Sequence, residues 1–166
     1  MKIGVISDTH IPSRCPKLPD EVFSIFSDVD LIIHCGDIND ISVIDELESI
    51  AKTLSVRGNT DILDLPEELS FKIGNFNIGV IHGHQIVPRG DLLKMKYYAL
   101  EKNWDILISG HTHTPLIEKI NCENGKYIYL LNPGSVGEPR YSPKTVMKIE
   151  IDENNNLIEP KLYVIR

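Results

Sequence analysis

The sequence predicts an α/β protein, and more specifically a four-layer α/β/β/α sandwich of two mixed sheets flanked by helices. In the first third of the chain, short apolar runs alternate with amphipathic helical patterns, which is typical of β-α-β units. In the second half, apolar runs follow one another through turns that contain Gly or Asn, which is typical of hairpins. Because no linker or internal repeat is visible, residues 1–166 are expected to form a single domain.

The first 60 residues follow a β-α-β-α-β order. Residues 2–7 form an apolar run typical of a buried strand, and Pro-Asp-Glu then opens a helix at residues 19–21. A second strand is expected at 31–34, a second helix at 41–52 and a third strand at 54–57. This order is typical of a mostly parallel sheet.

The second half is expected to contain a hairpin over 69–73 and 76–81, with Gly-Asn as its turn. A helix is expected at 91–103, with Tyr97 and Tyr98 as packing residues. Further strands are expected at 104–109, 116–120, 127–131, 145–151 and 157–164, with Asn-bearing turns at 122–125 and 154–156. These hairpin-linked strands predict an antiparallel second sheet.

Composition narrows the class of protein. Hydrophobic residues make up 42% and charged residues 25% of the chain, as in ordinary soluble globular proteins. The formal net charge of −7 argues against stable nucleic-acid binding, which favours a basic surface. No apolar run approaches the roughly 20 residues of a membrane span, and the first one is too short for a signal peptide, so a cytoplasmic protein without membrane association is expected. The three scattered cysteines indicate no disulfide framework and no CxxC zinc site.

Metal-binding side chains stand at the ends of five predicted strands. They are Asp8, His10, Asp37, Asn59, His82, His111 and His113. Because the carboxyl ends of neighbouring strands share one edge of a sheet, these side chains are expected to meet there. Carboxylate, amide and imidazole ligands suit Mn²⁺, Fe²⁺, Co²⁺, Ni²⁺ or Zn²⁺, and the lack of thiolates argues against structural zinc. Since seven ligands exceed what one such ion takes, two ions bridged by one carboxylate are expected.

Each of these residues, taken alone, has a simpler interpretation. Asp8 and Asp37 follow strands and could cap a turn or a helix. His34 lies in an apolar run and is expected to pack in the core with its polar atoms satisfied, and His84 is expected near the site rather than in it. Asp61 is expected to hydrogen-bond a ligand or a turn. The candidates for contact with a substrate phosphate are Arg14, Arg89 and Arg140, for which solvation is the alternative.

Taken together, the motifs resemble those of the calcineurin-like metallophosphoesterase superfamily. They are Asp8-x-His10, Gly36-Asp37, Gly58-Asn59, His82-Gly83-His84 and Gly110-His111-x-His113. The short length, Gly58-Asn59-Thr60-Asp61 and Asn132-Pro133-Gly134-Ser135 are similar to the compact archaeal and bacterial phosphodiesterases of that superfamily, to which the retromer scaffold subunit is also related. The resemblance runs from residue 1 to about residue 139.

The resemblance implies a role for each ligand. One ion would be held by Asp8, His10 and His113, and the other by Asn59, His82 and His111, with Asp37 bridging them. The two metal ions are expected to be Mn²⁺ or Ni²⁺, and Fe²⁺, Co²⁺ and Zn²⁺ stay open. The implied reaction is attack of a metal-activated hydroxide on a phosphodiester, with Asp37, Asn59 and His82 as the catalytic residues.

Thr60 departs from the pattern of many relatives, which carry a histidine at this position that is thought to protonate the leaving alkoxide. Because threonine has no suitable pKa for that step, weak or absent phosphomonoesterase activity is expected. The expected partner is a small phosphodiester, with a nucleotide as one option, and homo-oligomerisation stays open. The alternative function is a protein-binding scaffold with little catalysis. Competent residues at all seven ligand positions favour the enzyme.

Overall fold

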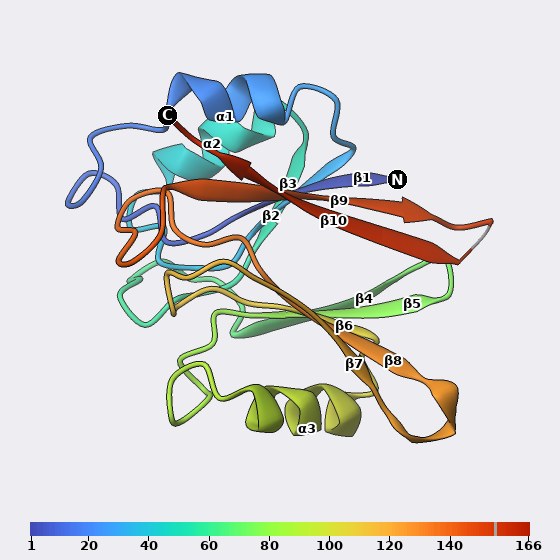
Figure 1. The fold of residues 1–166 in the computed structure, drawn as a ribbon. Helices are drawn as coiled ribbons and strands as arrows, with labels where there is room; N and C mark the ends of the chain where they lie inside the picture. Colours follow the sequence, from blue (N-terminus) through green and yellow to red (C-terminus); the bar gives the residue numbers. More distant parts are fainter. Residues whose placement is uncertain (155) are drawn as a thin grey trace.

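The computed structural model describes residues 1–154 and 156–166 and contains two five-stranded sheets. The strand orders are β10-β9-β1-β2-β3 and β4-β5-β6-β8-β7. Figure 1 shows α1 and α2 on the outer side of the first sheet and α3 on the outer side of the second. The predicted four-layer sandwich of two mixed sheets is therefore confirmed. The turn predicted at 154–156 contains Asn155, which lies outside the described residues.

The first sheet begins with the predicted β-α-β-α-β order. Its parallel strands are β1 (Lys2–Ile6), β2 (Leu31–His34) and β3 (Lys52–Ser55), connected by α1 (Asp20–Ile25) and α2 (Ser42–Glu48). The second helix was predicted to continue to residue 52, but Lys52 pairs with Leu31 and starts β3. The chain must therefore leave the helix at Glu48 and close a tight turn before the strand begins.

The prediction of an antiparallel second sheet is wrong in two respects. The strands β4 (Glu68–Ile73), β5 (Phe76–Ile81), β6 (Ile106–Ile108), β7 (Leu116–Asn121) and β8 (Tyr127–Asn132) form it, and β6 pairs in parallel with both β5 and β8. Helix α3 (Leu92–Lys102) carries the chain back between β5 and β6, as a parallel pair requires. The last hairpin, β9 (Thr145–Asp152) and β10 (Leu157–Val164), joins the first sheet beside β1 instead.

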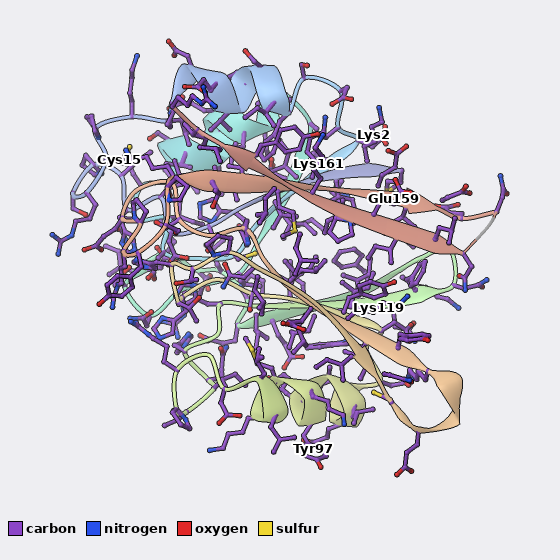
Figure 2. All side chains as sticks on the ribbon, in the orientation of Figure 1. Lys2, Cys15, Tyr97, Lys119, Glu159 and Lys161 are labelled. Carbon is purple, nitrogen blue, oxygen red and sulfur yellow. The ribbon has the colours of Figure 1, made fainter. Side chains whose placement is uncertain are left out.

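Apolar side chains fill the space between the sheets and beneath the helices on both outer sides (Figure 2). Trp104 is fully buried under α3, where a Cβ at Gly79 would lie 1.9 Å from its ring. Tyr98 packs at 5.8 Å from this ring, as predicted, whereas Tyr97 is 58% exposed and points outward from α3. Among the described residues, no helix is long and apolar enough to cross a membrane.

Backbone hydrogen bonds join the loops that follow β1, β2, β5 and β6. The N–H of Asp8 donates to the carbonyl of Gly36 at 3.0 Å, and the N–H of Gly110 donates to the carbonyl of His82 at 2.8 Å. The N–H of Gly137, in the loop after β8, donates to the carbonyl of Asp8 at 3.0 Å. Strand ends from both sheets therefore meet in one place, where the predicted ligands stand.

Candidate metal centre

Five of the predicted ligands adopt a left-handed backbone conformation, which is rare outside glycine. They are Asp8 (φ 52°), His10 (46°), Asp37 (57°), His111 (68°) and His113 (63°). This conformation costs about 1–2 kcal/mol per residue and persists only where surrounding contacts enforce it. Asp8 is held by the loop hydrogen bonds described above, and the N–H of His10 donates to the carbonyl of Asp37 at 3.0 Å. The strained turns aim side chains from several strand ends into one space.

Four side chains form a compact buried group: Asp8, His10, Asp37 and His113. One ligand atom from each lies within 4.8 Å of the others. Oδ1 of Asp8 lies 3.1 Å from Nε2 of His113 and 3.7 Å from Nε2 of His10. Oδ2 of Asp37 lies 3.5 Å from Nε2 of His10. Asp8 Oδ1 and His10 Nε2 are buried polar atoms without a hydrogen-bond partner among the described residues. Such orphaned atoms are costly unless a cation completes the group.

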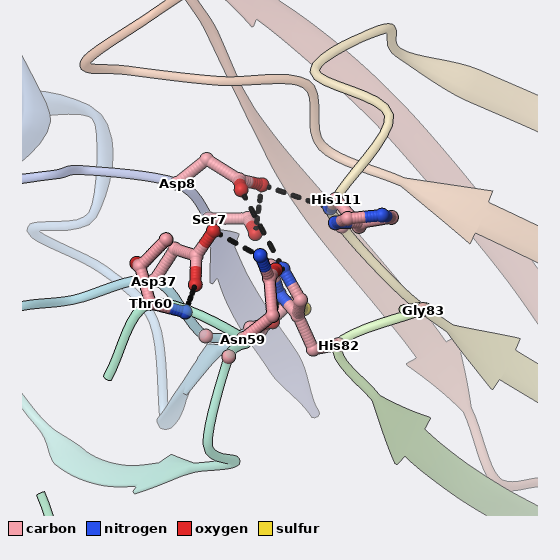
Figure 3. A network of polar contacts seen from close by, with 12 residues as sticks. Ser7, Asp8, Asp37, Asn59, Thr60, His82, Gly83 and His111 are labelled. Atoms are coloured by element: carbon pink, nitrogen blue, oxygen red, sulfur yellow. Dashed lines mark hydrogen bonds and ion pairs between the residues drawn. The ribbon is translucent and has the colours of Figure 1, made fainter. Parts of the chain in front are cut away.

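Asp37 also faces a second set of side chains (Figure 3). Its Oδ2 lies 3.3 Å from Nε2 of His82, and the same nitrogen lies 3.0 Å from Oδ1 of Asn59. Asp37 thus lies between His10 on one side and His82 on the other, which fits a carboxylate shared by two ions. Figure 3 shows Asp8, Asp37, Asn59 and His82 pointing toward one another, with His111 entering from another loop.

The outer nitrogens of two histidines fix which ring nitrogen faces the carboxylates. Nδ1 of His82 donates to the carbonyl of Cys35 at 2.7 Å, and Nδ1 of His113 donates to the carbonyl of Glu138 at 2.6 Å. Each neutral ring therefore turns the lone pair of Nε2 toward carboxylate oxygen atoms, which are also acceptors. A proton or a metal ion must lie between them. The donor set therefore fits a divalent cation.

The neighbouring carboxylates and imidazoles shift one another's pKa values. Burial opposes ionisation of Asp8, but the adjacent imidazoles of His10 and His113, when protonated, outweigh it and hold the pKa of Asp8 well below its usual range. Burial likewise opposes ionisation of Asp37, yet His82 lowers its pKa to about 2. Burial alone would lower the pKa of His82, but Asp37 and Asp8 raise it. Both carboxylates are therefore anionic and attract positive charge.

His111 is placed apart from the compact group. Its ring centre lies 5.0 Å from that of His82, and Nε of Arg89 donates to its Nε2 at 3.1 Å. Nη2 of Arg89 lies 3.5 Å from its Nδ1. Burial, followed by the charges of His82 and Arg89, lowers the pKa of His111 to about 4. The structure therefore brings His111 to the rim of the site and directs Arg89 at this histidine.

His84 lies outside the group, as expected, with Nε2 3.8 Å from Oε2 of Glu67. Arg14 pairs with Glu138, at 3.7 Å between Nε and Oε2. His34 lies in the core with its polar atoms satisfied, as predicted, although its partners were not identified from the sequence. His34 lies 3.1 Å from Oγ1 of Thr9 and accepts the N–H of Gly36, so it joins the loops after β1 and β2. Its position just before Gly36-Asp37 was the available signal.

The Asn132-Pro133-Gly134-Ser135 segment supports the site from the end of β8. The Oγ of Ser135 donates to the carbonyl of Asp8 at 2.9 Å and accepts the N–H of Glu138 at 2.8 Å. Nδ2 of Asn132 donates to the carbonyl of Gly110 at 3.0 Å. This segment therefore fastens the loop of Asp8 and the loop of His111 to each other.

The two-sheet sandwich with carboxylates and imidazoles clustered at the strand ends has the features of a metal-binding protein. Residues 1–154 match the calcineurin-like phosphoesterase superfamily domain, and the chain belongs to this superfamily. It is 48% identical over 165 residues to a probable metallophosphoesterase of Methanocaldococcus jannaschii, covering 99% of this chain and 82% of that protein.

Solved structures show the same fold. Vps29 from Entamoeba histolytica, complexed with Zn²⁺, is 29% identical with a TM-score of 0.80 and covers 99% of each chain. A novel archaeal phosphodiesterase is 24% identical with a TM-score of 0.72, covering 98% of this chain and 100% of that chain, and shares the fold. The predicted superfamily is confirmed, and Asp8, His10, Asp37 and His113 form a group that could hold a metal ion.

Proposed function

We propose that this protein is a divalent-metal-dependent phosphodiesterase that binds two ions. The observation that carries the proposal is the set of facing acceptors: the Nε2 lone pairs of His82 and His113 directed at the anionic carboxylates of Asp37 and Asp8. Such an arrangement is stable only with positive charge inside it. The superfamily to which the chain belongs gives that charge a metal-dependent hydrolytic role.

Asp8, His10 and His113 would hold one ion, and Asn59, His82 and His111 the other, with Asp37 shared between them. The position of Asp37, 3.5 Å from His10 and 3.3 Å from His82, supports the shared role. Binding by His111 requires Arg89 to release a ring nitrogen, since a neutral imidazole has one lone pair. When bound, the ions supply an activated water and neutralise the charge of the phosphoryl oxygens. Mn²⁺ or Ni²⁺ suits this mixed oxygen and nitrogen ligand set.

The chain's own residues orient the ester and limit which esters react. Asn59 is exposed, and its Nδ2 group is free to donate to a phosphate oxygen while Oδ1 faces His82. Thr60 follows it, and its N–H donates to Oδ1 of Asp37 at 3.0 Å. The Thr60 hydroxyl cannot supply a proton to a leaving alkoxide at neutral pH. Diesters with stable leaving groups are therefore the proposed substrates, with weak or absent phosphomonoesterase activity.

A protein-binding scaffold with little catalysis is the second candidate, and the similarity to Vps29 favours it. The two candidates differ in whether they need a complete set of metal ligands. A scaffold has no need of anionic carboxylates held against orphaned imidazole nitrogens, and this chain retains a ligand-competent residue at every predicted position. The enzyme is therefore the function that the site supports better.

Metal analysis combined with a panel of phosphodiester and phosphomonoester substrates tests the proposal. With Mn²⁺ or Ni²⁺, the protein is expected to bind two ions and to hydrolyse bis(p-nitrophenyl) phosphate far faster than p-nitrophenyl phosphate. Asp8→Asn and His82→Ala are each expected to lower the rate by roughly 100-fold or more. Asp20→Asn, an exposed change on α1, is the control. Unaffected hydrolysis in both site variants would refute the mechanism, whereas no metal-dependent hydrolysis by the wild-type protein would favour the scaffold.

A further inference from the structure

A pocket of about 460 Å³ adjoins the metal centre on the side of His10. His10 and Arg14 from the loop after β1, Thr60 and Ile62 from the loop after β3, and Glu138 from the loop after β8 line it. Its volume lies in the usual range of ligand pockets, roughly 300–1,000 Å³. Because His10 belongs to both the pocket and the compact ligand group, a molecule whose phosphate lies at the metal centre can extend into this space.

Ile62 provides an apolar wall. Its side chain is 96% exposed, whereas Leu63 and Leu65 of the same loop pack against the core beneath α1 and α2. A single exposed isoleucine is ordinary on a protein surface, but this one lines a pocket beside the predicted reaction centre. Covering it with an apolar face of a ligand is favourable, because apolar surface is then removed from water.

Arg14 and Glu138 provide the polar part of the pocket. Their side chains are 61% and 36% exposed, and Nε lies 3.7 Å from Oε2, which is longer than a hydrogen bond. The guanidinium therefore keeps free N–H donors and a planar face, and the carboxylate keeps free acceptor positions. A guanidinium plane stacks on aromatic bases, and a carboxylate accepts hydrogen bonds from sugar hydroxyls or base N–H groups.

These features together suit a nucleoside better than other alcohol components of a phosphodiester. A nucleoside offers a flat ring that can cover Ile62 and stack on Arg14, and polar edges that can reach Glu138. An alkyl chain would cover Ile62 but desolvate the ion pair without replacing its hydrogen bonds to water. A small alcohol such as glycerol would leave Ile62 in water.

We propose that this pocket binds the nucleoside substituent of the phosphodiester, with Ile62 and Arg14 as specificity-determining residues. The inference rests on the proposed function, because the phosphate must lie at the metal centre for its substituent to reach the pocket. It adds the chemical class of the substituent and the residues that select it. Thr60 also belongs to the wall of this pocket.

Two substrates with the same p-nitrophenolate leaving group isolate the contribution of the pocket. They are thymidine 5′-(p-nitrophenyl phosphate) and methyl p-nitrophenyl phosphate, each assayed with Mn²⁺. The wild-type protein is expected to favour the thymidine ester in kcat/KM by about tenfold or more. Ile62→Asp and Arg14→Ala are each expected to lower that preference by about fivefold or more. Leu93→Asp, a matched change of a 59% exposed residue on α3, is expected to leave the preference unchanged.

A binding measurement separates failure of the pocket from failure of the catalytic proposal. Calorimetric titrations in Mn²⁺ compare binding of thymidine 5′-monophosphate with binding of inorganic phosphate. Ile62→Asp is expected to lower the affinity for the nucleotide and to leave the affinity for phosphate unchanged. Equal kcat/KM values for the two esters, or a hexyl ester that surpasses the thymidine ester, would overturn the nucleoside assignment while hydrolysis itself persists. If neither ester is hydrolysed, the phosphodiesterase proposal fails, and equal affinity for nucleotide and phosphate then overturns the pocket too.

Discussion

The carboxylate of Asp61 accepts a hydrogen bond from the backbone N–H of Asp37 at 2.9 Å. The same oxygen accepts the N–H of Gly58 at 2.9 Å, and the other oxygen accepts the N–H groups of Ile38 at 2.9 Å and Asn39 at 2.8 Å. One buried carboxylate therefore gathers four backbone donors from the loops after β2 and β3. It holds the left-handed turn of Asp37, and with it the carboxylate that faces both histidine sets.

Asp61→Asn is expected to weaken the site through this loop. An asparagine offers one acceptor oxygen and turns an NH2 group toward backbone donors, so some of the four hydrogen bonds are lost. The free energy of unfolding is expected to fall by about 1–3 kcal/mol, and Mn²⁺ affinity by about 10–100-fold. Denaturant unfolding and calorimetric titration measure these effects. Asp64→Asn, an exposed change in the same loop, is the control, and an unaltered Mn²⁺ affinity in Asp61→Asn would refute the positioning role.

Thr60→His is expected to raise the turnover of phenyl phosphate, a monoester whose leaving group requires a proton. A general acid contributes about 10²–10⁴-fold, so an increase of tenfold or more is expected if the imidazole reaches the leaving oxygen. Thr60 is exposed, and its bond to Asp37 uses the backbone N–H, so the substitution leaves that contact intact. Thr60→Gln, which is polar but has no titratable proton, is the control. A flat or lower rate in Thr60→His would count against the missing-acid explanation.

Gly110→Ala is expected to disrupt the site by direct collision. A Cβ at this position would lie 2.0 Å from Oγ of Ser7 and 2.7 Å from Oδ2 of Asp8. Gly125→Ala is the control, because no atom lies within 4 Å of an added Cβ there and its expected cost comes from the left-handed φ of 72° alone. Both variants are expected to lose about 1 kcal/mol or more of stability, but only Gly110→Ala should lose Mn²⁺ affinity. Equal metal affinity in the two variants would show that Asp8 tolerates displacement.

The order of the strands and helices could be predicted from the sequence, and so could the meeting of Asp8, His10, Asp37 and His113 at one place. Apolar runs that end in Asp8, Asp37 and His82 carry their own strand signal, and hydrogen bonds between successive loops bring these residues together as the strand order predicts. Asp61 was also predicted as a supporting residue, and its bonds to the Asp37 loop confirm this. Local pattern is enough here because each ligand lies within four residues of a strand's predicted carboxyl end.

The sheet partners could not be predicted in the same way. The β9–β10 hairpin has the alternation of any hairpin, and only the free edge of β1 decides that it completes the first sheet. The parallel pairing of β6 with β8 depends on strands that are not consecutive. The contact between Arg89 and His111 likewise spans 22 residues of irregular chain, helix and strand. Such relationships follow from packing of the whole molecule, and the hydrophobic periodicity of either segment does not indicate its partner.

His34 predicts a pH dependence of stability. Its Nδ1 accepts the N–H of Gly36 at 3.1 Å, so the neutral ring carries its proton on Nε2, which lies 3.1 Å from Oγ1 of Thr9. Burial lowers the pKa of His34 to about 4, against about 6.5 in an unfolded chain. Between these pH values His34 is protonated in the unfolded chain but neutral in the folded protein. The free energy of unfolding therefore decreases as pH falls through this window. The lost stability is on the order of 3 kcal/mol.

The raised pKa values of His10 and His82 act in the opposite direction, so the effect must be measured against a variant. His34→Gln keeps an acceptor for Gly36 and a donor for Thr9 but does not titrate. Denaturant unfolding of both metal-free proteins from pH 7 to pH 4 is expected to show the wild type losing about 3 kcal/mol relative to His34→Gln. The contributions of the other histidines cancel in this difference. A difference that is independent of pH would mean that His34 binds its proton equally in both states, contrary to its buried, hydrogen-bonded position.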